Sequence, residues 1–117
     1  MKILEAHTIT GTELTKMQRY ALTSDPETAS AQSVVGERIK PVAWLIYLDV
    51  NAKGEEQEIL SVTDGDKTFA TISSTFKREF ARCVEVADGA AFEIEVISGT
   101  ANNGREYVTC RLVWVDE

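Results

Sequence analysis

Apolar and polar positions along the chain follow two different periods, and the change between them marks the predicted elements. From Arg38 to Val50 most positions are apolar on both faces, which is typical of a strand covered on both sides. Turn signals at 51–54 and 64–66 separate this segment from two further strand-like stretches. Residues 38–73 are therefore predicted to form a three-stranded meander, with Trp44 in the core.

The apolar period lengthens after the meander. From Phe76 to Ala87 the apolar residues have helical spacing, and Asp88-Gly89 is a typical helix end. Residues 90–98 alternate again, and the Asn103-Gly104 turn leads into a last strand over about 105–115. A helix followed by a two-stranded hairpin is the predicted arrangement.

The segment before the meander is predicted to be an extension of the domain. After a short extended start, Thr10-Gly11-Thr12-Glu13 fits a capping box, which predicts a short helix over about 11–22. The small and polar stretch that follows contains Pro26 and is predicted to be a loop.

The predicted order after the N-terminal helix is strand, strand, strand, helix, strand, strand. This is the order of an OB-fold, a five-stranded Greek-key barrel. We predict one mainly β, OB-fold-like domain over residues 1–117, in which 1–37 form a helix and loop extension and 38–115 form the barrel. A small sandwich, or another barrel with one helix, has the same order and remains an alternative.

Composition narrows the class of protein. The 117 residues are 44% hydrophobic and 26% charged, which suits one soluble domain. No apolar run approaches the roughly 20 residues of a membrane helix, and the N-terminus lacks a signal peptide, so a cytoplasmic protein without a membrane partner is expected. The net charge of -7 argues against duplex DNA but allows single strands held in a local basic groove.

Motifs for catalysis and for metal binding are missing from the sequence. It has no nucleophile elbow, phosphate loop, dinucleotide fingerprint or zinc-ligand spacing, so a protein that is not an enzyme and has no cofactor or metal is expected. Cys83 and Cys110 each fall on the apolar side of their segments and are interpreted as small buried residues.

Cations and aromatic residues alternate in two predicted strands. Lys67 with Phe69, and Arg105 with Tyr107 and Arg111, are spaced by even numbers, so each set shares one strand face. Lysine and arginine side chains pair with the phosphates of a single strand, and aromatic rings stack on its unpaired bases at about 1–3 kcal/mol per base. In an OB-fold, the loops after the first and fourth strands flank the bound strand. The candidate nucleic-acid-binding residues are Lys53, Lys67, Phe69, Arg105, Tyr107 and Arg111.

Each aromatic candidate also has a purely structural interpretation. Tyr107 could be a surface tyrosine under arginine stems, and Phe69 could belong to the core. Trp114 lies on the apolar side of the last strand and is expected in the core.

Two stretches, DVNAKGEEQEILSVTDGDKTFATISSTFKREF and IEVISGTANNGREYVTCRLV, resemble small single-stranded-DNA-binding proteins. Phages and mobile elements of Gram-positive bacteria encode these proteins in replication gene clusters. The resemblance covers about residues 39–113. It implies an OB-fold that coats single-stranded DNA without catalysis, and it favours as contacts Lys53, Lys67, Phe69, Arg105 and Tyr107.

These observations predict a sequence-tolerant single-stranded DNA-binding protein of phage or mobile-element replication or recombination. Its partners would be single-stranded DNA and other replication proteins, and the sequence leaves homo-oligomerisation open. The acidic excess supports an alternative from another class: a phage protein-interaction module that engages a host or replisome protein.

Overall fold

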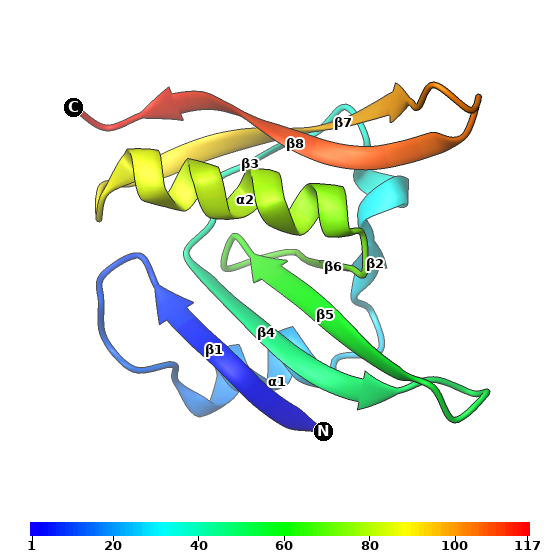
Figure 1. The fold of residues 1–117 in the computed structure, drawn as a ribbon. Coiled ribbons are helices and arrows are strands. Elements are labelled where there is room, and N and C mark those ends of the chain that lie inside the picture. Colours follow the sequence, from blue (N-terminus) through cyan, green and yellow to red (C-terminus); the bar gives the residue numbers. More distant parts are fainter.

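The strands form two sheets, with the longer helix between them, in a computed structural model that describes residues 1–117 (Figure 1). The order of strands is β1-β4-β5-β6-β2 in the first sheet and β3-β7-β8 in the second. The strands are β1 (Lys2–Thr8), β2 (Ala29–Ser30), β3 (Arg38–Ile39), β4 (Ala43–Val50), β5 (Glu56–Thr63), β6 (Thr68–Thr71), β7 (Phe92–Thr100) and β8 (Glu106–Val115). The helices are α1 (Lys16–Thr23), the 3-10 helix η1 (Ala31–Val34) and α2 (Ser74–Ala87).

Residues 38–50 belong to both sheets. Arg38 and Ile39 pair with β7, and after a bend at 40–42 the same segment continues as β4, which pairs with β1 and β5. Pro41 lies at this bend, where a residue without an amide hydrogen costs no ladder hydrogen bond. One bent segment therefore connects the two sheets.

The predicted mainly β fold and its order of meander, helix and hairpin are confirmed, but the predicted closed barrel is wrong. Closure would require the third strand of the meander to lie beside the last strand. Instead, the outer edge of β6 is occupied by β2, because Ala29 and Ser30 pair in parallel with Phe69 and Ala70. Across the remaining gap, the Ser73 hydroxyl donates to the Val108 carbonyl at 3.0 Å.

Helix α2 fills the space between the sheets. Its buried side chains include Phe76, which contacts Phe69 of the first sheet, and Phe80, which contacts Phe92 of the second, with ring centroids 5.7 and 6.1 Å apart. Trp44 is 7% exposed and meets Phe80 edge to face, as expected for a core residue. Burying several aromatic rings supplies much of the apolar area that stabilises a domain of this size.

The two cysteines are free and buried within this core. They lie on α2 and β8, and a hydrogen bond between the thiols, together with burial, raises the pKa of Cys110. Their interpretation as small buried residues is confirmed.

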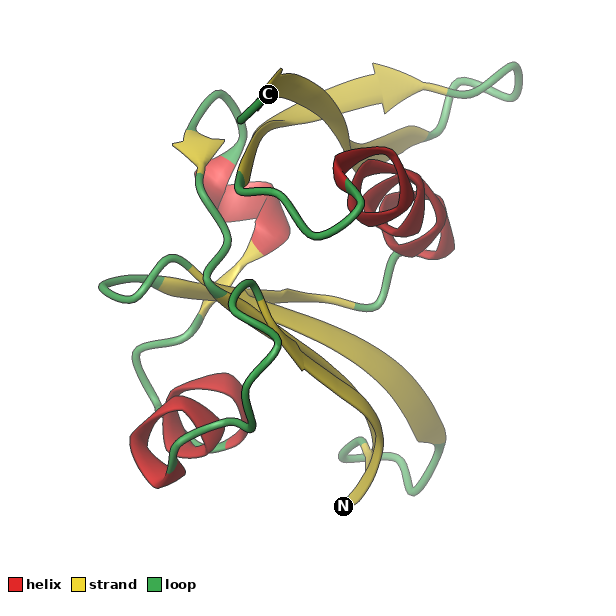
Figure 2. Ribbon diagram, turned by 90° about the vertical axis from the view of Figure 1, so that its left-hand side faces the viewer, coloured by secondary structure: helices red, strands yellow, loops and turns green.

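Helix α1 covers the opposite face of the first sheet, so that the two helices lie on either side of it (Figure 2). Leu22 of α1 packs with Ala43, Leu45 and Tyr47 in a second, smaller cluster. The prediction that the strand through Trp44 is covered on both faces is therefore confirmed.

The N-terminal extension differs in detail from the prediction. Helix α1 begins at Lys16, and Thr15 with Gln18 forms the capping box, instead of Thr10 with Glu13. The Thr10 hydroxyl instead pairs with that of Thr12 at 2.8 Å. The predicted loop after this helix contains β2 and η1, because tertiary pairing overrides its weak local signals.

Trp114 is 42% exposed, so its predicted place in the core is wrong. The pairing of β7 with β8 shifts between Glu93 and Ile94: Ile94 faces Leu112, and Glu93 faces Trp114. Val113 is the extra residue of a β-bulge, and one extra residue turns the next side chain to the opposite face.

Ser73 has two roles at the seam between the sheets. Its hydroxyl caps α2 by accepting from the Phe76 amide at 3.2 Å, and it also donates to Val108 of β8. We expect Ser73→Ala to lower the free energy of unfolding by about 1–2 kcal/mol in urea titrations. Ser74→Ala, one residue along, removes an exposed hydroxyl and should change stability by less than about 0.5 kcal/mol. Equal effects of the two changes would contradict the role of Ser73.

Candidate nucleic-acid interface

A groove of about 1200 Å³ opens where the two sheets diverge. The β4–β5 and β7–β8 hairpins project on the same side of the molecule, one from each sheet (Figure 1). Three segments contribute most of the lining: 70–75 from β6 and the first turn of α2, 105–108 from β8, and 30–35 around η1. The groove therefore occupies the gap that a closed barrel would have filled.

The lining is rich in hydroxyl groups and contains three exposed apolar side chains. Ile72 is 58% exposed, Val35 is 40% exposed and Tyr107 is 38% exposed. Such surfaces can contact the faces of unpaired bases, and hydroxyl groups can donate to phosphate or sugar oxygens. The serine and threonine residues of the lining are Ser30, Thr71, Ser73, Ser74, Thr75 and Ser98.

Tyr107 lies across the neighbouring strand. It faces Gly99 in the β7–β8 ladder, and a Cβ atom added to Gly99 would lie 2.5 Å from the ring carbon Cζ of Tyr107. The absence of a side chain at Gly99 thus lets the ring rest on the β7 backbone. The ring is positioned by the strand and still partly open to solvent.

The cations of the two hairpin turns have no ion-pair partners; Arg105 lines the groove, and Lys53 lies outside its lining. Arg105 follows the β7–β8 turn, in which Asn103 Oδ1 accepts from the Arg105 amide at 3.0 Å. Lys53 lies in the β4–β5 turn, where Asn51 Oδ1 accepts from the Lys53 amide at 2.9 Å. No carboxylate lies within 4.0 Å of the charged group of either side chain, so both cations are available to an anion.

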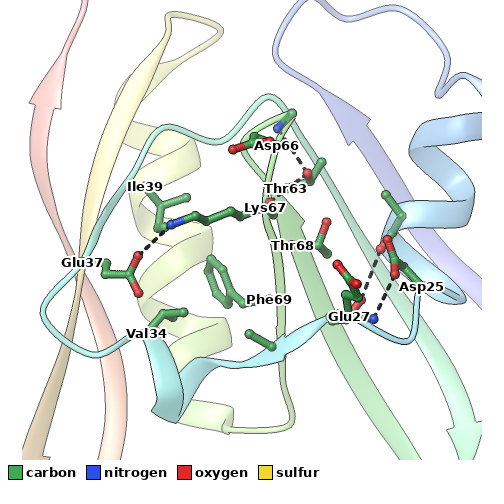
Figure 3. A pocket seen from close by; sticks show the side chains of 14 residues that line it. Asp25, Glu27, Val34, Glu37, Ile39, Thr63, Asp66, Lys67, Thr68 and Phe69 are labelled. Carbon is green, nitrogen blue, oxygen red and sulfur yellow. Dashed lines mark hydrogen bonds and ion pairs between the residues drawn. The ribbon is translucent and has the colours of Figure 1, made fainter.

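Phe69 and Lys67 do not belong to this groove. They line a second pocket, of about 260 Å³, beneath the segment that follows α1 (Figure 3). Phe69 is 2% exposed because its side of β6 faces α2, so its predicted stacking on a base is wrong.

Lys67 lies in acidic surroundings. Its Nζ atom is 3.6 Å from Glu37 Oε1, and the same pocket is lined by Asp25, Glu27 and Asp66 (Figure 3). These carboxylates repel phosphate. The structure does not bring Lys67 together with Arg105 and Tyr107.

Arg111 lies on the outer face of the β3-β7-β8 sheet. Its Nη2 and Nε atoms are 2.6 and 2.8 Å from one oxygen of Glu95. Arg111 is still 62% exposed, and a guanidinium has five N–H donors, so donors remain for another anion. It does not line the groove.

Several lining residues were missed by the sequence analysis. Gln32 and Val35 come from the segment predicted to be a loop, which carries no motif of its own. Tyr47 lies in the strand that the sequence predicts to be covered on both faces. Burial raises the pKa of its hydroxyl group, and the nearby Asp49 carboxylate raises it further. Ile72 follows the end of β6, and only a prediction of where that strand ends could have suggested its exposure.

The packing of Tyr107 on Gly99 can be tested directly. Gly99→Ala places a methyl group where the ring lies, so we expect the ring to swing away from β7. The stability cost should stay below about 1 kcal/mol, because the ring is the free end of a mobile side chain. NMR should show loss of the nuclear Overhauser contacts between the Tyr107 ring and residue 99. Thr100→Ala is the control, and retained contacts in the Gly99→Ala protein would contradict this geometry.

Comparisons with known proteins give no match for this chain: no family model, no curated protein and no solved structure corresponds to it. The resemblance to single-stranded-DNA-binding proteins stays a prediction from the sequence. Support for any function therefore comes from the chemistry of the groove, its flanking loops and the outer face of the smaller sheet.

Proposed function

We propose that this protein binds single-stranded DNA, with little sequence preference, in the groove between its two sheets. The proposal includes a role in phage or mobile-element DNA replication or recombination, as the resemblance implies. We also propose that the fold is an open variant of the OB-fold, in which residues 38–50 correspond to the bent first strand. The segments β5, β6, α2, β7 and β8 follow in the order of that fold.

The observation that carries the proposal is that Arg105 and Tyr107, two positions apart in the chain, both line the edge of the groove. The tyrosine offers a partly exposed aromatic face, and the arginine offers a charge that no carboxylate neutralises. A stacked base and a paired phosphate need these two groups within one nucleotide of each other. Lys53, on the opposite hairpin, supplies a second free cation.

The groove suits an unpaired strand better than a duplex. Its wall contains an exposed apolar side chain, Ile72, that can contact a base face only when the base is unpaired. Few free cations border the groove, and the chain as a whole carries a charge of -7, so a duplex would gain little from phosphate neutralisation.

Tyr107→Ala is the decisive change for this function. We expect it to weaken binding to a labelled oligo-dT of about 30 nucleotides by at least about fivefold, the low end for one stacked base. Fluorescence anisotropy measures the affinity, and circular dichroism checks that the fold is intact. The matched control is Tyr20→Ala, because Tyr20 is 47% exposed on α1 and does not line the groove.

Salt should weaken the binding of the unmodified protein, because each neutralised phosphate releases counterions. Wild-type affinity in the Tyr107→Ala protein would remove Tyr107 from the site. An affinity independent of salt would contradict the phosphate contacts, and no binding even at low salt would overturn the proposed function.

A second candidate function rests on the acidic pocket of Figure 3. Its carboxylates surround an apolar floor that includes Phe69 and Val34, a combination that suits a basic side chain of a protein partner. This function would be favoured if the protein failed to bind oligo-dT at low salt and bound a lysine- or arginine-rich peptide instead.

A further inference from the structure

The outer face of the β3-β7-β8 sheet is the side turned away from α2. Cross-strand pairing sets its side chains in rows: Tyr107 faces Gly99, Glu95 lies between Arg38 and Arg111, and Trp114 faces Glu93. Lys40 follows β3 and reaches over Trp114. This face and its groove end hold four of the chain's 12 Lys and Arg residues, and the strands of the sheet carry three of the 19 Asp and Glu residues, of which Glu93 and Glu95 are on this face. The four cations are Arg38, Lys40, Arg105 and Arg111.

Trp114 is the unusual member of this face. The bulge at Val113 turns the indole away from the apolar core and onto the outer face, where Trp114 is 42% exposed. Lys40 Nζ lies 4.9 Å from the ring centroid, a cation–π contact that places a positive charge beside the aromatic surface. Tryptophan is among the residue types that most often dominate binding energy at interfaces.

The outer face is continuous with the groove. Tyr107 lines the groove, and its ring also rests on Gly99 of the outer face. From Gly99 to Glu93, which faces Trp114, β7 extends about 20 Å at about 3.3 Å per residue. The cations of Arg111 and Arg38 lie between these two aromatic side chains.

We propose that a single strand of DNA leaving the groove at Tyr107 continues along the outer face as far as Trp114. One base stacks on the indole, and the phosphates pass Arg111, Arg38 and Lys40. This inference rests on the proposed function and extends its binding site. The track ends at Trp114, because Asp116 and Glu117 follow directly and repel phosphate.

Glu95 is compatible with this track and limits its affinity. It accepts from Nε and Nη2 of Arg111, which leaves other guanidinium donors for a phosphate. Arg38 is opposite Glu95 but forms no ion pair within 4.0 Å, so its charge is free. The carboxylate holds Arg111 in position while it offsets part of the positive charge.

Tryptophan fluorescence provides the test, because the chain has two tryptophans and only Trp114 is exposed. The probes are oligo-dT of about 5 and about 15 nucleotides, near the two ends of the range that one OB domain covers. We expect only the longer oligonucleotide to quench the fluorescence. Trp114→Phe should abolish this quenching.

Arg38→Ala is the second variant. It removes a cation without an ion pair, and we expect it to weaken binding of the longer oligonucleotide about threefold or more while binding of the shorter one is unchanged. Arg19→Ala, which removes an exposed and unpaired cation on α1, is its matched control. The fluorescence of buried Trp44 reports whether the Trp114→Phe protein is folded.

The outcomes separate the two proposals. If both oligonucleotides bind, but Trp114 is not quenched and Arg38→Ala binds the longer one normally, the outer track is overturned and the groove stands. If neither oligonucleotide binds at low salt, the proposed function fails and the track fails with it. Quenching by the longer strand alone, with the length-dependent loss in Arg38→Ala, supports the track.

Discussion

Packing of α2 between the two sheets is the interaction on which the rest of the structure depends. Phe76 and Phe80 place aromatic rings against both sheets at once, and Phe69 and Phe92 meet them from opposite sides. A helix about 10 Å wide at this position keeps the sheets apart. Because the sheets cannot meet along β6 and β8, the space between those strands becomes a groove, and Ser73 spans it with a hydroxyl group.

The same arrangement explains how a chain with a charge of -7 can expose unpaired cations on the surfaces proposed to bind DNA. Carboxylates are prominent around the pocket beneath the segment after α1, where Lys67 is paired with Glu37. Free cations lie on the two hairpin turns, at Lys53 and Arg105, and on the outer face of the smaller sheet. Local distribution, more than total charge, decides where a phosphate can approach.

Sequence periodicity predicted most of the strands and the second helix, because long apolar stripes and Asn-Gly or Asp-Gly turns are strong local signals. It could not predict that the barrel stays open, because the pairing of β2 with β6 joins residues about forty positions apart and leaves no periodic trace. For the site, it predicted Arg105 and Tyr107 on one strand face, and both line the groove. It misplaced Phe69, because alternation alone does not say which side of a strand faces the helix, and it misplaced Trp114, because the bulge at Val113 has no marker.

The bend at residues 40–42 joins the two sides of the molecule mechanically. Lys40, over the indole of Trp114, is two residues from Val42, whose amide and carbonyl hydrogen-bond to Thr63 of β5 and Ile9. Pro41 between them holds φ within a narrow range, so the bend is a stiff elbow. The elbow joins β3 of one sheet directly to β4 of the other, so a change in the width of the groove would displace the lysine on the opposite face of the smaller sheet.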